Sequence, residues 1–303
     1  MKILCIVQND WAGVCYGLSQ AVNRETDHEM RVMCKNPHKY GYAQDMFELK
    51  ELKGFYQEIL DDSDVVLTGQ SQIEYIPYNI PIPDDKIKCI WHGGSRYRTN
   101  FKFFNRSVHP MFDKVYALHG LVGLDRNNIL LDQPFDTARY GYVVKDPNKF
   151  VVCHSPSNEK KKGTKHFIKA MSRLKKVIPS FEPNLIMDRT AKECLDLKRE
   201  CHVFFDQIAG FDIPYEAGAI HGHGLSLVES ASFGAVCLNG GASNNEPIFR
   251  VTNDDDIYNV CLDLYRDRDK LEIISRSTRE WVEKAHSYKA VANQFIKPLE
   301  DLI

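Results

Sequence analysis

Two turns in the second half of the chain carry residues suited to binding phosphate. The first turn, residues 154–164, follows a predicted strand and precedes a predicted helix, whose N-terminus offers unpaired N–H groups to an anion. Gly163 allows the backbone to approach a ligand closely. The turn also supplies three neighbouring cations, Lys160, Lys161 and Lys162. A solvent-exposed helix start, with Thr164 as its N-cap, is the alternative interpretation.

The second turn, residues 221–224, is rich in glycine and histidine and leads into another predicted helix. Glu229 lies on this helix among apolar and small residues. A buried carboxylate needs a partner to offset the cost of its desolvation. A pair of ribose hydroxyls is one such partner, and a buried structural salt bridge is the alternative.

Residues in the first half of the chain could line a site at the ends of predicted strands. His92, followed by Gly93 and Gly94, ends one strand, where ligand-binding residues lie in parallel sheets. A satisfied core histidine is the alternative. Gly13 and Gly17 follow the first strand without the spacing of a dinucleotide-binding fingerprint, so an ordinary strand-to-helix turn is expected there.

A basic stretch interleaved with aromatic residues follows at 96–106. Its cations include Arg96, Arg98 and Lys102. Such a stretch could hold an anionic acceptor, for example a nucleic acid or a phosphorylated lipid or glycan. The alternative is a surface helix whose long cationic side chains lie along apolar surface.

Apolar runs rich in β-branched residues alternate with helical patterns, which predicts an α/β fold built from βαβ units. The predicted strands are Ile3–Val7, Arg31–Cys34, Val65–Thr68, Ile87–Trp91, Lys114–Leu118, Ile129–Leu131, Phe150–His154, Asn184–Met187, Val203–Asp206 and Ala235–Leu238. The predicted helices are 165–177, Leu225–Phe233, Ser277–His286 and Lys289–Ile303. The acidic cluster at 254–256 is expected in a polar, solvated turn.

A polar segment at 143–149 contains a proline and precedes a new strand, which marks the predicted domain boundary. We therefore expect two Rossmann-like domains, residues 1–145 and 146–288, followed by a C-terminal helix over 289–303. Ligands in such sheets bind at the carboxyl ends of the strands, which here predicts a site in a cleft between the two domains.

Composition narrows the classes of function. A length of 303 residues suggests two domains, and a formal net charge of -2 argues against a bulk polyanion binder. Nine cysteines without a Cys-x-x-Cys pair indicate a reducing compartment and no zinc or dithiol site. The sequence shows no signal peptide and no run of about 20 apolar residues, so a cytoplasmic protein is expected, with peripheral membrane contact left open.

Taken in order, these stretches resemble family 4 of the glycosyltransferases, a large retaining group with the two-domain GT-B fold. The order runs from a glycine loop after the first strand, through His92-Gly93 and Lys162-Gly163, to Gly224-Leu-Ser-Leu-Val-Glu229. Gln133-Pro-Phe-Asp136 and His286-Ser-Tyr288 are also similar to segments of the family. The resemblance covers most of the chain.

The resemblance implies a role for each of these residues. Lys162 would contact the donor diphosphate, Glu229 the donor ribose, and His92 the transferred sugar. Further donor contacts would come from Gly13, Ser157, Lys160, Lys161, Gly163, His221, Gly224, Leu225 and Ser226. The N-terminal half would bind the acceptor, and the last helix would return to that half.

The implied reaction transfers a sugar from a nucleotide-diphosphate sugar, UDP- or GDP-linked, to an acceptor hydroxyl with retention of configuration. Helix N-termini and lysines can stabilise the leaving diphosphate, so no metal is required and no further cofactor is implied. His221 stands where the family has the first of two glutamates, and His154-Ser-Pro-Ser157 stands where it usually carries an arginine. Three alternatives stay open: a catalytically silent nucleotide-sugar-binding module, a nucleotide-sugar epimerase and a DNA-base-modifying glycosyltransferase.

Overall fold

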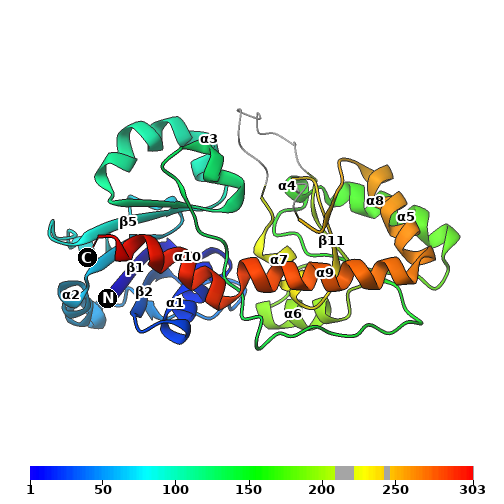
Figure 1. Cartoon of the computed structure of the whole chain (residues 1–303), viewed down its shortest axis with the longest axis horizontal. Coiled ribbons are helices and arrows are strands. Elements are labelled where there is room, and N and C mark those ends of the chain that lie inside the picture. Colours follow the sequence, from blue (N-terminus) through cyan, green and yellow to red (C-terminus); the bar gives the residue numbers. More distant parts are fainter. Residues whose placement is uncertain (209–221, 242–245, 303) are drawn as a thin grey trace. The chain divides into compact units, whose positions relative to one another are not determined.

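The computed structural model describes residues 1–208, 222–241 and 246–302. These residues form two compact units (Figure 1). Unit 1 contains residues 1–136 and the C-terminal segment that begins at Ser287. Unit 2 contains the described residues from Thr137 to His286, so the segment 143–149 lies within it.

Unit 1 is built on a parallel sheet of seven strands in the order β3-β2-β1-β4-β5-β6-β7. The strands are β1 (Lys2–Asn9), β2 (Glu29–Asn36), β3 (Met46–Phe47), β4 (Val65–Thr68), β5 (Ile87–His92), β6 (Lys114–Ala117) and β7 (Ile129–Leu130). Residues 3–7 of the central strand β1 are all buried. Such a continuous apolar run is typical of a parallel strand that is covered on both faces.

Helices complete unit 1. They include α1 (Val14–Glu25), α2 (Lys53–Asp62), α3 (Gly94–Phe103) and α10 (Tyr288–Glu300). The C-terminal helix α10 packs against α1 (Figure 1). Val291, Phe295 and Leu299 of this helix are fully buried. The hydroxyl of Tyr116 donates to the Phe295 carbonyl at 2.8 Å, so α10 is an integral part of the unit 1 core.

Unit 2 is built on a parallel sheet of five strands in the order β12-β11-β10-β8-β9. The strands are β8 (Val151–His154), β9 (Glu182–Leu185), β10 (Val203–Gln207), β11 (Val236–Asn239) and β12 (Ile248–Arg250). Its helices are α4 (Glu159–Lys162), α5 (Thr164–Val177), α6 (Ala191–Arg199), α7 (Leu225–Ser232), α8 (Asp254–Arg266) and α9 (Arg268–His286). The prediction of two Rossmann-like α/β units is confirmed.

The amphipathic helix predicted at 165–177 is the clearest case of sequence pattern producing packing. Phe167, Met171 and Leu174 lie on one face of α5 and are buried in the unit 2 core. α5 packs there against α8, while α7 packs against α6 and α9. The spacing of three and four residues places these side chains on a single stripe.

Three predictions about element ends were wrong. Residues 160–162 are not part of an open loop but form the short helix α4, whose N-cap Asn158 accepts from the Lys161 N–H at 2.9 Å. The acidic cluster 254–256 does not lie in a turn but begins α8, where carboxylates are favoured by the helix dipole. The helix predicted from Ser277 begins at Arg268.

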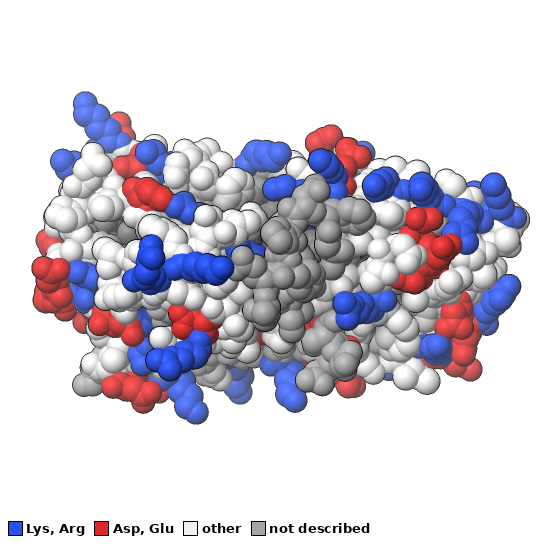
Figure 2. Space-filling model, turned by 90° about the horizontal axis from the view of Figure 1, so that it is seen from above, with Lys and Arg blue, Asp and Glu red and all other residues white. Residues whose placement is uncertain are grey.

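Positive and negative side chains are mixed on the face of the molecule drawn in Figure 2. Figure 2 shows Lys and Arg interspersed with Asp and Glu across the face it draws. All nine cysteines are free thiols, and eight of them are buried. Within residues 1–208, 222–241 and 246–302, we find no helix with the length and apolar character that a membrane crossing requires.

We predict that replacing Gly234 by alanine destabilises unit 2. Gly234 has a φ of +83° in the turn between α7 and β11, and an added Cβ would lie 2.4 Å from Cε2 of Tyr142. Left-handed backbone and overpacking together predict a loss of about 1–3 kcal/mol in the free energy of unfolding. Urea titration measures this loss.

Gly54→Ala is the matched control, because an added Cβ at Gly54 in α2 meets nothing within 4 Å. It should leave stability unchanged or raise it by up to about 1 kcal/mol. Equal effects of the two substitutions would contradict the strain assigned to Gly234.

Candidate functional site

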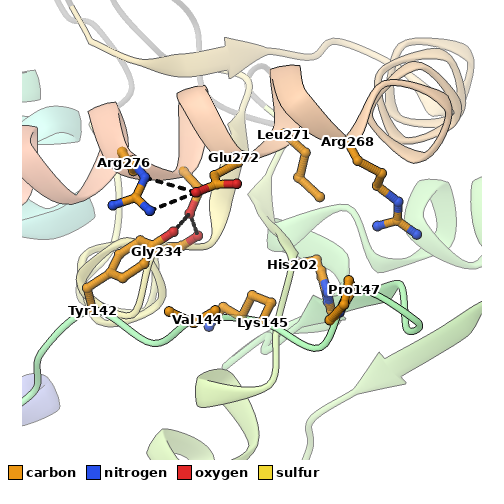
Figure 3. A pocket seen from close by; sticks show the side chains of 11 residues that line it. Tyr142, Val144, Lys145, Pro147, His202, Gly234, Arg268, Leu271, Glu272 and Arg276 are labelled. Carbon is orange, nitrogen blue, oxygen red and sulfur yellow. Dashed lines mark hydrogen bonds and ion pairs between the residues drawn. The ribbon is translucent and has the colours of Figure 1, made fainter.

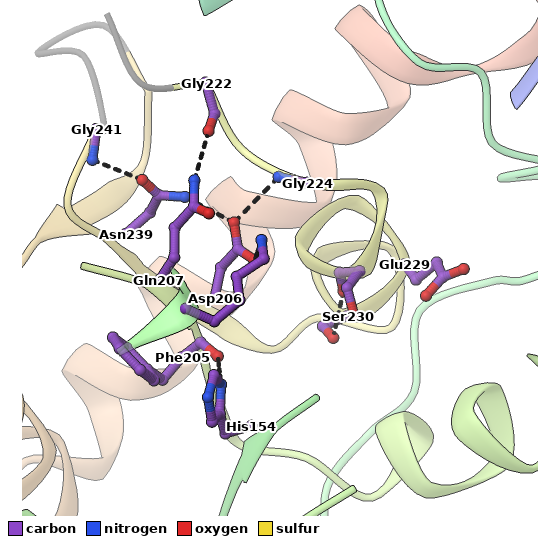
Figure 4. Close-up of polar contacts among 12 residues, drawn as sticks. His154, Phe205, Asp206, Gln207, Gly222, Gly224, Glu229, Ser230, Asn239 and Gly241 are labelled. Carbon is purple, nitrogen blue, oxygen red and sulfur yellow. Dashed lines mark hydrogen bonds and ion pairs between the residues drawn. The ribbon is translucent and has the colours of Figure 1, made fainter. Parts of the chain in front are cut away.

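The carboxyl edge of the unit 2 sheet is organised around a carboxylate that sequence reasoning did not single out. Asp206, near the end of β10, is 3% exposed. It accepts hydrogen bonds from the Gly224 N–H at 3.0 Å and Asn239 Nδ2 at 2.8 Å (Figure 4). Lys162 Nζ donates to the same carboxylate at 2.8 Å. The signal in the sequence is a charged residue that ends the apolar run Val203-Phe-Phe205.

These contacts keep Asp206 ionised. Burial opposes the charged form, but the ammonium of Lys162 and the hydrogen bonds from Lys162 and Gly224 outweigh it, so the pKa of Asp206 is lowered. Lys162, assigned by resemblance to the donor diphosphate, is thus paired with Asp206. A Cβ added at Gly224 would lie 3.2 Å from Lys162 Nζ, so this ammonium lies beside the N-terminus of α7.

The first turn of α7 begins beside Lys162 and Asp206. Gly224 is the N-cap residue, and no side chain caps the helix. Leu225 and Ser226 occupy the first two helical positions, where N–H groups have no preceding helical carbonyl to bind. The structure therefore places Lys162 beside Gly224, which directly precedes Leu225 and Ser226.

The residues around α4 differ from one another in their exposure to solvent. Gly163 has a φ of +75° and joins α4 to α5. It is the N-cap of α5, the position that the alternative interpretation of this turn gave to Thr164. Ser157, Lys160 and Lys161 are exposed on the outer side of this turn. Lys162 is the half-buried member of the lysine run and contacts the Asp206 carboxylate.

Thr164 has a different partner, the buried ring of His154. Nε2 of His154 lies 2.9 Å from Thr164 Oγ1, and Nδ1 lies 2.9 Å from the Phe205 carbonyl. Because a carbonyl can only accept, Nδ1 carries the proton and the hydroxyl donates to Nε2. Burial lowers the pKa of His154 to about 4, so the ring is neutral at physiological pH.

Glu229 does not share this site. It lies on the side of α7 away from Asp206 (Figure 4). Its Oε2 accepts from Lys198 Nζ of α6 at 2.5 Å, and both side chains are 3% exposed or less. The structure therefore shows the buried salt bridge that was the alternative interpretation of this residue.

The glycine and histidine turn before α7 is described only in part. His221 lies outside the described residues. His223 Nε2 lies 3.1 Å from His286 Nε2. Across the described ranges we find no cluster of three or more His, Cys, Asp or Glu arranged to hold a metal ion.

In unit 1, His92 is a core residue in a chain of polar contacts. It is fully buried at the end of β5. Nδ1 lies 2.8 Å from Ser71 Oγ, Nε2 lies 2.9 Å from His109 Nε2, and His109 Nδ1 lies 3.2 Å from Asp125. The ring also stacks on Tyr97 at 3.8 Å between centroids. Both ring nitrogens therefore have hydrogen-bond partners within unit 1, which agrees with the alternative interpretation of His92 as a satisfied core histidine.

The turn after β1 is partly exposed and contacts the turn after β4. Trp11 is 60% exposed, and the neighbouring Ala12 has a φ of +60°. The side-chain amide of Gln70, itself at φ +54°, accepts from the Trp11 N–H and donates to the Trp11 carbonyl, each at 3.3 Å. Non-glycine residues in this region are strained, and such strain is concentrated at functional sites.

Gly13 ends the first of these turns. It has a φ of +66° and precedes α1, and a Cβ there would lie 3.3 Å from Tyr42. Asp10 caps the helix by accepting from the N–H groups of Cys15 and Tyr16 at 2.9 and 3.0 Å. Burial raises the pKa of Asp10 to about 6, although these hydrogen bonds favour its charged form.

The cations expected to contact an acceptor lie on α3 in varied surroundings. Arg96 forms an ion pair with Glu74. Arg98 is half-buried, and exposed Lys102 lies 5.8 Å from the centre of the Phe101 ring. The positive charge of this helix is therefore partly neutralised by its own surroundings.

Comparison with known proteins identifies the fold. No protein-family model matches the chain, and no curated protein matches its sequence. HepE of Anabaena in complex with UDP-glucose has a TM-score of 0.64 at 12% identity, covering 99% of this chain and 100% of that one. Sucrose-phosphate synthase from Thermosynechococcus elongatus has a TM-score of 0.61 at 10% identity, covering 100% and 99%. The chain has the GT-B fold.

The same fold accommodates more than one chemistry. The UDP-GlcNAc 2-epimerase from Neisseria meningitidis, bound to UDP-GlcNAc, has a TM-score of 0.55 at 11% identity and covers 99% of this chain and 100% of its own. Identity at this level establishes architecture alone, so the activity must be argued from the side chains of this chain.

We predict that Glu229→Ala destabilises the protein whatever its catalytic effect. Removing one partner of a buried ion pair leaves the other charge unpaired, which costs about 3–5 kcal/mol in the free energy of unfolding. The double substitution Lys198→Met with Glu229→Leu should recover most of this loss. Urea titration of the unsubstituted protein, Glu229→Ala and the double variant measures the loss and its recovery.

Asp263→Ala is the control, because Asp263 pairs with Lys270 at 2.7 Å with both side chains about half exposed. It should leave stability nearly unchanged, as exposed pairs do. A Glu229→Ala protein as stable as this control would remove the structural role of the pair.

We also predict that acid weakens the fold through its buried histidines. Burial lowers the pKa of His154 and His202 to about 4 and that of His92 to about 2, below the ordinary value of 6.5. Between pH 6.5 and 4 the unfolded chain binds more protons, so stability falls as pH falls, by about 1.4 kcal/mol per pH unit for each such ring. Asp10, with its raised pKa, acts in the opposite direction but is a single group.

Urea titrations at pH 7, 6 and 5 measure this dependence. His154→Gln should reduce the slope of stability against pH by roughly the contribution of one ring. A stability that stays constant from pH 7 to 5 in the unsubstituted protein would contradict the prediction.

Proposed function

We propose that the chain is a glycosyltransferase that moves a sugar from a nucleotide-diphosphate sugar to an acceptor hydroxyl with retention of configuration, as its resemblance to family 4 implies. The observation that carries this proposal is the position of Lys162 Nζ beside the N-terminus of α7 at the carboxyl edge of the unit 2 sheet. An ammonium and a helix N-terminus are the two features of a chain that most favour phosphate.

Lys162 would bind the donor diphosphate while remaining held by Asp206. An ammonium has three donors, and the Asp206 carboxylate occupies one of them. The ion pair fixes the direction of the lysine before a ligand arrives, which lowers the cost of ordering it on binding. Leu225 and Ser226 would add backbone N–H groups to the same phosphates.

The chemical step needs stabilisation of the negative charge that grows on the leaving diphosphate. Fixed cations and helix dipoles supply this stabilisation without reorganisation during the reaction. In this proposal Lys162 and the first turn of α7 fill that role, so a metal is not required. Since solved structures of this fold hold UDP-glucose and UDP-GlcNAc, a UDP-linked sugar is the donor we would test first, with GDP-linked sugars second.

Glu229 is assigned a positioning role in this proposal. Its pairing with Lys198 holds α7 from the side opposite to Asp206, so a ribose contact would have to compete with a buried lysine. Recognition of the acceptor is proposed for unit 1, where Arg98 and Lys102 of α3 would attract an anionic glycan, lipid-linked or nucleic-acid acceptor.

We predict that UDP-sugars raise the melting temperature of the protein and that Lys162→Met reduces the effect. A ligand at about 100 times its dissociation constant stabilises the folded state by ~2.7 kcal/mol. Loss of one charge-assisted hydrogen bond, about 1.5–3 kcal/mol, weakens binding by roughly 10- to 100-fold. Thermal melts with UDP-, GDP-, ADP- and CMP-sugars measure both effects.

Lys176→Met is the matched control. Lys176 is exposed near the end of α5, so this substitution removes the same charge at a distance from the donor site. Equal weakening by both substitutions, or no stabilisation by any sugar nucleotide, would contradict the donor site. Product analysis with donor alone then separates the alternatives: an epimerase converts the sugar without an acceptor, and a silent module returns it unchanged.

A further inference from the structure

Unit 2 also contains a pocket of about 160 Å³ (Figure 3). It is bordered by His202 just before β10, Gly234 just before β11, and the segment 142–147 before β8. The residues before these strands mark their amino ends. The pocket therefore shares the sheet with the donor site but none of its residues.

The charges around this pocket are unbalanced. Lys145, Arg268 and Arg276 line it, against a single carboxylate, Glu272. Glu272 is already paired with Arg276, whose Nη2 and Nε donate to Oε1 at 2.7 and 3.1 Å (Figure 3). Lys145 donates to the carbonyl of Arg199. In the part of the chain that the structure describes, neither Lys145 nor Arg268 forms a salt bridge.

Aromatic rings hold Arg268 in place at one wall. Its guanidinium carbon lies 4.9 Å from the ring centres of both Phe150 and Tyr265. Burial lowers the pKa of Lys145 to about 8 and also lowers the pKa of Arg268. Two cations thus sit in partly desolvated positions where a counter-ion would be stabilising.

His202, Tyr142 and Leu271 line the remaining walls of the pocket and carry no charge. His202 is neutral, because Nδ1 accepts from the Val151 N–H and Nε2 donates to the Asp146 carbonyl, each at 3.2 Å. Tyr142 and Leu271 add apolar surface.

We propose that this pocket binds phosphate or a phosphate monoester, as a second anion site of unit 2 distinct from the donor site. A cavity of roughly 150 Å³ holds a benzene molecule, which has more heavy atoms than phosphate, so the volume suffices. A phosphate monoester carries about −1.5 to −2 charges at pH 7. This matches the excess of three cations over one carboxylate better than the single charge of a carboxylic acid does.

Equilibrium dialysis with radiolabelled inorganic phosphate, at constant ionic strength, tests the proposal. The experiment uses the full chain carrying Lys162→Met, which removes the cation of the donor site. We expect one phosphate per chain, a loss of affinity of roughly tenfold or more in Arg268→Gln, and no change in Arg266→Gln, an exposed neighbour outside the pocket. Acetate should compete at least roughly tenfold less well than phosphate.

Three results would overturn the proposal. They are the absence of phosphate binding, phosphate binding that Arg268→Gln leaves intact, and acetate competing as well as phosphate. Because Arg268 also contacts two rings, Lys145→Gln serves as a second pocket variant. Thermal melts establish that the Lys162→Met chain and both pocket variants are folded.

Discussion

The buried carboxylate of Asp206 is the constraint on which the carboxyl edge of unit 2 depends. A charge that is 3% exposed is stable there because donors reach it from three separate elements, α4, the residue before α7, and the end of β11. Moving any of these elements would leave a buried charge underpaired, which is costly. The same contacts therefore fix the position of Lys162 relative to the first turn of α7.

The helix α7 is held by ionic contacts on both sides. The Gly224 N–H at its start binds Asp206, and Glu229 on its far side binds Lys198. Buried ion pairs add little net stability compared with apolar packing, because desolvation offsets their attraction. What they do provide is a defined placement of α7, and a preorganised helix N-terminus is what binding an anion at this edge requires.

The sequence predicts the strands that have their own apolar run, including the two-residue β7, and misses β3 and β12. β3 and β12, of two and three residues, give no periodic signal of their own and depend on neighbouring strands. The first half of α9 was missed because its start is rich in charged residues. The role of Glu229 could not be decided, because its partner Lys198 lies 31 positions earlier on another helix.

Asp206 illustrates the same limit from the other direction. Its residue type and its place at the end of an apolar strand were visible in the sequence, but its partners are separated from it by 18 to 44 positions along the chain. Spacing rules describe neighbours on one helix or strand. A hub that joins several elements becomes visible once the strand order brings β8, β10 and β11 side by side.

In unit 1, His92 is fully buried and is contacted by the turn after β4. Ser71, which contacts the His92 ring, has a φ of +63°, and Gln70 beside it is also in the left-handed region. Each such residue costs free energy that surrounding contacts must offset, and here Gln70 is tied to Trp11 and Asp10. The indole of Trp11 is thus exposed to a ligand at this edge, whereas the imidazole of His92 is buried.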